Sequence, residues 1–192
     1  MRRAFALLLV AGLACGVLST RAAGDGLDEL MRTLAARHHG EVDFIEQHFL
    51  ALLSRPSESS GVLIYDAPDR LEKRTLEPRA ESLLLSGNSV TVQRGTHRRT
   101  VDLQAHPQIL PFVESIRATL AGDRDALERI FRVEYSGSAA RWMLILEPRA
   151  AEVGKMVRQV RIDGSGAVLR HVEIFEADGD RSLMTLRERA AP

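Results

Sequence analysis

The chain has 192 residues, with 26 basic and 26 acidic side chains and a formal net charge of zero. Nucleic-acid binding requires a basic stripe, and attraction to an anionic membrane surface requires a basic cluster. The balanced charge argues against both, so we expect no nucleic-acid partner. Cys15 is the only cysteine in the sequence, so we expect no disulfide, thiol nucleophile or thiolate metal site in the rest of the chain.

The first 24 residues are organised like a secretory signal peptide. Arg2 and Arg3 precede an uncharged apolar run over residues 4–18, and small residues follow just before Asp25. The apolar run is short for a membrane span, which needs about 20 residues. We therefore predict a periplasmic protein, cleaved near residues 22–25. Lipid anchoring at Cys15 is the less favoured alternative, because Gly12 rather than leucine stands three residues before it.

Removal of residues 1–24 leaves residues 25–192, a length that suits one domain. The removed segment holds three arginines and no acidic residue, so the net charge becomes −3. Leu27, Leu30, Met31 and Leu34 recur at helical spacing and predict an amphipathic helix over about residues 26–37 with Asp25 as its cap. Strands are then predicted at residues 42–53, 60–66, 71–76, 82–85, 89–94 and 99–103. Gly87-Asn88 predicts a tight turn between the fourth and fifth of these strands.

The hydrophobic period changes to a helical one between Pro107 and Gly122. Asp123 is placed to cap a second short helix. Strands return, with turns expected at Asp163-Gly164 and Asp178-Gly179, at residues 132–135, 141–146, 156–163, 168–176 and 181–186. This order predicts an α+β fold, in which one curved antiparallel sheet of about 10–11 strands has short helices on one face.

Several predicted strands are apolar at consecutive positions, at residues 62–65, 83–85 and 142–146. A sheet with one wet face should alternate between apolar and polar residues. Such strands either belong to an ordinary core buried on both sides or enclose a small ligand. The residues alone leave both interpretations open.

Candidate catalytic groups are few. His48 has Asp43 and Glu46 nearby, but their spacing matches no metal-binding pattern. The Asp178-Gly179-Asp180 segment lacks the acidic twelfth position of an EF-hand loop, where Arg189 stands. The sequence contains neither a Gly-x-Ser-x-Gly elbow nor a phosphate-binding loop. We therefore predict a protein that is not an enzyme and uses no cofactor or metal; acyl-group chemistry through His48 is the weakest alternative.

Five short signatures follow one another along residues 25–188. They are Asp43-Phe44-x-Glu46, Gly61-Val-Leu63-x-Tyr65-x-x-Pro68, Gly87-Asn88-x-Val90, Leu146-Glu-Pro148-Arg149 and Val172-Glu-Ile174-x-x-x-x-Gly179-Asp180. With the helical insert between Pro107 and Phe131, this order resembles the LolA-like family of periplasmic outer-membrane lipoprotein carriers. The resemblance covers nearly all of the predicted mature chain.

The resemblance implies an unclosed antiparallel β-barrel, lined by apolar side chains and covered on one side by short lid helices. It implies a monomeric carrier that shields the acyl chains of a lipoprotein or related lipid on the way from an inner-membrane exporter to an outer-membrane receptor. Burial stabilises each CH₂ group by about 0.8 kcal/mol, which suits an oily cavity. The family's lid is tied to the barrel by an arginine before the proline of the second signature, but Ala67 occupies that position here.

The resemblance also suggests which side chains bind the ligand. The strands are expected to contribute Phe44, Leu63, Tyr65, Leu84, Val90, Val92, Trp142, Leu144, Leu146, Val172 and Ile174, and the lid Ile109, Phe112, Val113 and Ile116. For each residue, ordinary core packing is the competing interpretation, because the pattern does not say which face of an apolar strand points inward. The alternative function is a non-transport binding or regulatory module of the same fold that senses or scaffolds envelope components.

Overall fold

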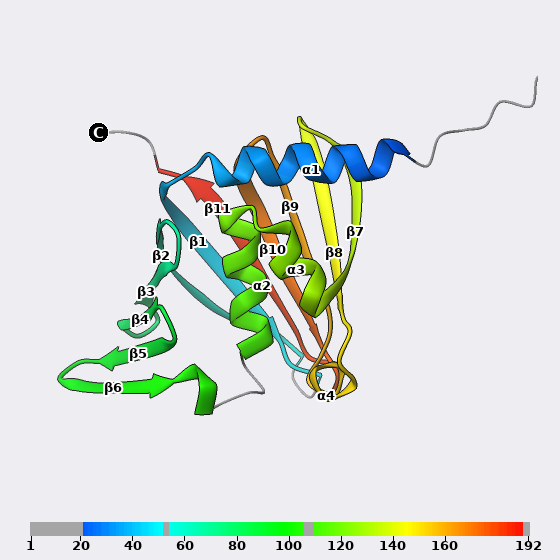
Figure 1. Cartoon of the computed structure of the whole chain (residues 1–192). Coiled ribbons are helices and arrows are strands. Elements are labelled where there is room, and N and C mark those ends of the chain that lie inside the picture. Colours follow the sequence, from blue (N-terminus) through cyan, green and yellow to red (C-terminus); the bar gives the residue numbers. More distant parts are fainter. Residues whose placement is uncertain (1–20, 52–53, 106–109, 190–192) are drawn as a thin grey trace, which may run out of the picture.

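The computed structural model describes residues 21–51, 54–105 and 110–189 (Figure 1). Within these ranges the chain forms one antiparallel sheet of 11 strands, with helices packed on one face. The predicted signal-peptide core, Cys15 and Ile109 lie outside the described residues.

The strands follow one another along the chain, interrupted by a short helical insert. The strands are β1 (His39–Phe49), β2 (Ser57–Asp66), β3 (Arg70–Glu77), β4 (Glu81–Ser86), β5 (Ser89–Arg94), β6 (His97–Asp102), β7 (Phe131–Ser138), β8 (Arg141–Pro148), β9 (Val157–Ser165), β10 (Val168–Glu176) and β11 (Arg181–Glu188). The helices are α1 (Arg21–Ala35), the 3₁₀ turn η1 (Leu103–Ala105), α2 (Leu110–Ala121), α3 (Arg124–Ile130) and α4 (Ala151–Gly154).

The strand order in space is β6-β5-β4-β3-β2-β1-β11-β10-β9-β8-β7. Strand β1 therefore joins two halves, each built from neighbours in sequence, and β6 and β7 form the two ends of the sheet. The prediction of a single antiparallel sheet that is not closed into a barrel is confirmed. Figure 1 shows α1 lying along one end of the strands and α2 crossing the curved face of the sheet.

Two local predictions match the structure. Gly87 has φ +53°, which lets the chain reverse between β4 and β5, where Ser86 pairs with Ser89. The Asp123 carboxylate accepts a hydrogen bond from the backbone N–H of Ala126 at 2.9 Å and caps α3.

Two other local predictions are wrong. Helix α1 begins at Arg21, so Asp25 lies within the helix rather than at its cap. Gly164 is not in a turn but in β9, because the indole of Trp142 packs over it: a Cβ added at Gly164 would lie 2.5 Å from Trp142 Cζ2. That glycine permits close packing of a side chain, not a chain reversal.

The hydrophobic core fills one half of the curved face. Leu27, Leu30, Met31 and Leu34 form the buried stripe of α1. They pack with Leu127 and Phe131 from the α3 region against buried side chains of β8 and β9, which are Trp142, Leu144, Leu146, Val160 and Ile162. Helices α1 and α3 therefore close the β7–β9 half of the sheet.

Candidate functional site

The other half of the curved face encloses a cavity of about 410 Å³ between the sheet and α2. This volume lies within the range of about 300–1,000 Å³ usual for small-molecule sites. The side chains that α2 contributes to the wall are Val113, Ile116 and Leu120. The remaining wall comes from β1–β5, β10, β11 and the segments next to them.

Strand alternation and register select the lining residues. On β2 the residues Leu63 and Tyr65 face the cavity, and on β3 Leu71 and Lys73 do so. On β4 the lining residues are Leu83 and Leu85, which lie two apart as the period of a strand requires.

Seven of the expected ligand-binding residues belong to this wall, namely Leu63, Tyr65, Val90, Val113, Ile116, Val172 and Ile174. The apolar lining that sequence reasoning did not name consists of Val42, Leu71, Leu83, Leu85, Leu120, Ala167, Leu169, Met184 and Leu186. The described polar groups in the wall are Arg37, Glu46, Lys73, Ser182 and the hydroxyl of Tyr65.

Trp142, Leu144 and Leu146 do not line the cavity. They point to the same curved face, but α1 and α3 cover them, and each is at most 1% exposed. These three residues therefore belong to the packed core and not to the expected ligand-binding wall, because α1 and α3 cover the part of the curved face that β8 forms.

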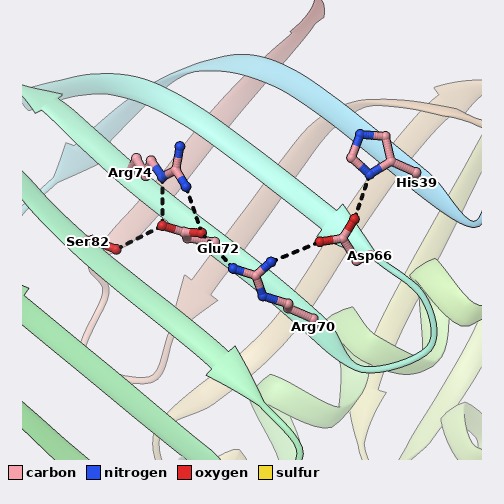
Figure 2. A network of polar contacts seen from close by, with 6 residues as sticks. All are labelled: His39, Asp66, Arg70, Glu72, Arg74 and Ser82. Carbon is pink, nitrogen blue, oxygen red and sulfur yellow. Dashed lines mark hydrogen bonds and ion pairs between the residues drawn. The ribbon is translucent and has the colours of Figure 1, made fainter.

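Leu84 also differs from the expectation. Since Leu83 and Leu85 face the cavity, Leu84 faces the outer side of β4, where it pairs with Glu72 of β3. The outer face carries the charged network of Figure 2, in which Glu72 accepts hydrogen bonds from Arg70, Arg74 and Ser82. Leu84 therefore lies among polar groups on the face opposite the cavity.

Three further residues expected to bind the ligand are Phe44, Val92 and Phe112, and neither Phe44 nor Val92 lines the cavity. Phe44 shares the inner face of β1 with Val42 and Glu46 but is buried, with the Lys73 ammonium 5.0 Å from its ring centroid. Val92 pairs with the lining residue Leu83 but is not itself among the residues that line the cavity. Phe112 belongs to α2, but its side chain lies outside what the structure describes.

Glu46 and Lys73 form an ion pair in the wall of the cavity. The Glu46 carboxylate also accepts hydrogen bonds from the hydroxyls of Ser59 and Ser182, each at 3.3 Å. Burial alone would raise the pKa of the Glu46 carboxyl, but Lys73 and His48 outweigh it and hold this pKa below its usual value. Glu46 is therefore a buried, fully engaged carboxylate.

The same cluster includes His48. His48 Nε2 lies 3.3 Å from Glu46 Oε2, so of the two nearby acidic residues Glu46 is the partner of this histidine. The two serine hydroxyls, however, donate to Glu46 and not to the imidazole. Among the described residues, no group of three His, Cys, Asp or Glu side chains is arranged to hold a metal ion.

Arg117 connects α2 to the sheet. Its guanidinium donates to the backbone oxygen of Gly87 in the β4–β5 turn and forms an ion pair with Glu114 at 2.8 Å. The position at which the resemblance implies a lid arginine is occupied by Ala67, whose backbone N–H donates to the backbone oxygen of His38. In this chain Arg117 of α2 therefore makes a polar contact between that helix and the β4–β5 turn.

A family model described as "Outer membrane lipoprotein carrier protein LolA-like" matches residues 19–191. The chain belongs to the LolA-like family. The resemblance drawn from the short signatures is thus confirmed, and members of the LolA-like family are binding or carrier proteins rather than enzymes. A search of curated protein sequences finds no match.

A comparison with solved structures finds matches of low sequence identity to this LolA-like protein. A lipoprotein-sorting protein domain from Vibrio parahaemolyticus is 11% identical, with a TM-score of 0.45 over 88% of this chain and 94% of that one. A LolA superfamily protein from Nitrosomonas europaea is 10% identical, with a TM-score of 0.44 over 88% and 94%. The MucA/MucB complex from Pseudomonas aeruginosa matches at 12% identity and a TM-score of 0.44, over 86% of this chain and 58% of that one.

The described part of the chain contains no helix long and apolar enough to cross a membrane.

Proposed function

We propose that this LolA-like protein is a periplasmic carrier that shields the acyl chains of a lipoprotein or related lipid in its cavity. The observation that carries the proposal is the cavity itself, an apolar space of about 410 Å³ under α2 in a chain of this family. Each CH₂ group transferred from water into such a space gains about 0.8 kcal/mol. An acyl chain is therefore the class of ligand that this wall favours most.

The proposal extends to the course of transport. The protein would receive its cargo from an inner-membrane exporter and pass it to an outer-membrane receptor, acting as a monomer after removal of residues 1–24. Release requires that the cargo be held loosely, and a cavity covered by one short helix fits that requirement. Neither a cofactor nor a metal enters this cycle.

Two neighbouring leucines on β4 provide a test with a built-in control. Leu83→Lys places an ammonium in the cavity, beside Lys73 and Val92 in the register. Leu84→Lys places the same group on the outer face, opposite Glu72. Titration with a fluorescent fatty-acyl probe should show binding by the wild type and by Leu84→Lys, and at least tenfold weaker binding by Leu83→Lys.

Equal binding by both variants, with each still folded by circular dichroism, would place the probe outside the cavity. Failure of the wild type to bind any acyl probe, together with a stable complex with an envelope protein, would favour the non-transport binding module instead.

A further inference from the structure

The hydroxyl of Tyr65 is the polar group in the cavity that the fold does not explain. Tyr65 lines the cavity and is 6% exposed. Its Oη atom is buried and has no hydrogen-bond partner among the described residues. An unpaired buried hydroxyl is unfavourable, and phenylalanine would fill the same space without that cost. The hydroxyl therefore points to a partner that arrives with a ligand.

The surroundings of Tyr65 indicate the chemistry of that partner. Tyr65 pairs with Gly40 of β1, and a Cβ at Gly40 would lie 3.0 Å from Nε of Arg37, so the guanidinium lies over the glycine. Arg37 is also fixed by the backbone oxygen of Ala167 at 3.3 Å. Burial raises the pKa of the Tyr65 phenol and the negative charge of Asp69, in the turn after β2, raises it further, so the hydroxyl keeps its proton and can donate. A protonated phenol in a mostly apolar wall favours a neutral acceptor, because a charged acceptor would lose its hydration there.

The cavity gives the ligand a direction. Beyond Tyr65 the wall includes the aliphatic side chains of Val42, Leu186, Val172 and Ile174, with Ser182 paired to Ile174. A hydrocarbon tail can follow this wall, while an oxygen at its head stays beside the phenol.

We propose that Tyr65 donates a hydrogen bond to the carbonyl oxygen of an ester-linked or amide-linked acyl chain and so sets the direction in which the chain enters. This inference rests on the proposed acyl-binding function and adds to it the recognised group. A phenol donates one such bond, and the carbonyl is the first polar atom that an acyl chain offers.

The experiment compares wild type, Tyr65→Phe and Tyr135→Phe in competition against a fluorescent acyl probe. The chain has two tyrosines, and Tyr135 packs beside the core in the other half of the sheet, so it is a matched control. The competitors are a saturated fatty acid, its methyl ester and the alkane of equal chain length. Thermal unfolding of the three ligand-free proteins is recorded in parallel.

For Tyr65→Phe we expect the methyl ester to bind about threefold to tenfold more weakly, the ionised acid to lose less affinity than the ester, and the alkane to bind as in wild type. The ligand-free variant should unfold at the wild-type temperature or higher, because it loses an unpaired hydroxyl. Tyr135→Phe should bind each of the three competitors with the affinity of wild type.

Several outcomes would overturn the inference. Equal weakening of all three competitors would assign Tyr65 to cavity shape, and weakening of the acid alone would assign it to recognition of charge. A clearly lower unfolding temperature for Tyr65→Phe would show that the hydroxyl already has a stabilising partner. If wild type binds none of the probes, the proposed function fails together with the inference; if all bind without discrimination by Tyr65→Phe, this inference alone fails.

Discussion

The carboxylate of Glu46 and the ammonium of Lys73 meet in the wall of a cavity that is otherwise mostly aliphatic. The Glu46 side chain is 9% exposed and that of Lys73 is 26% exposed. A buried charge that loses its partner is costly, so this pair should matter more than an ion pair at the surface.

Glu46→Gln should lower the free energy of unfolding at pH 7 by about 1–3 kcal/mol, since it leaves Lys73 without a counter-ion. The folded-state pKa of Glu46 lies below its usual value of about 4.5, so its stabilising contribution is present above that pH and is lost as the pH falls through the folded-state pKa. Wild type should therefore lose more stability than Glu46→Gln on acidification below pH 4.5.

Urea titrations at a series of pH values measure both effects. Glu152→Gln is the matched control, because Glu152 and Lys155 form an exposed ion pair worth less than about 1 kcal/mol. Equal losses in the two variants would contradict a special role for the buried pair.

Leu144→Ala should separate stability from ligand binding. Leu144 is fully buried under the helices of the packed half, so its truncation should cost about 2–5 kcal/mol of unfolding free energy. Acyl-probe affinity should stay near that of wild type, because Leu144 is outside the cavity. Leu83→Ala should have the reverse profile, and calorimetry with probe titration would reveal a misassignment of the two halves.

Arg117→Ala should speed the release of a bound acyl probe. It removes the contact between α2 and the Gly87 backbone oxygen, so α2 should open more easily and the dissociation rate should rise about threefold or more. Stopped-flow displacement measures this rate. Arg158→Ala is the control, because Arg158 also donates to a backbone oxygen, that of Ala177, far from α2 along the chain; the same acceleration in both variants would argue against a specific tie.

Gly164→Ala should destabilise the fold. The new Cβ would lie 2.5 Å from Trp142 Cζ2 and 2.2 Å from the backbone oxygen of Val168, so the sheet must shift at a cost of about 1–3 kcal/mol. Gly154→Ala meets no atom within 4 Å and should be neutral. Thermal unfolding of the two variants checks the assignment of Gly164 to a packed strand, which a neutral Gly164→Ala would contradict.

Local chemistry made much of the fold predictable from sequence. The Gly87-Asn88 turn, the Asp123 cap and the stripe on α1 each depend on residues within a few positions of one another, and each has the predicted role. The prediction of a turn at Asp163-Gly164 is wrong because the requirement for glycine comes from Trp142, more than 20 residues away in the chain.

The site was less predictable because its limits depend on contacts between distant segments. Leu144 and Leu63 both lie in apolar runs of their strands, and the positions of α1 and α3 decide that the first is packed while the second lines a cavity. A run of three leucines does not show which of them point to the inner face of the strand, so the expectation that Leu84 lines the cavity is wrong. Glu46 and Lys73 come from different strands, and the sequence of either strand alone does not predict that they form an ion pair.

The central claim is that the space beneath α2 holds hydrocarbon. Native mass spectrometry of the protein purified from periplasm without detergent tests it most directly. We predict a population heavier than the polypeptide by the mass of an acylated molecule, which Leu83→Lys loses and Leu84→Lys keeps. A bare polypeptide mass in all three proteins, unchanged after incubation with fatty-acyl lipids, would contradict the account.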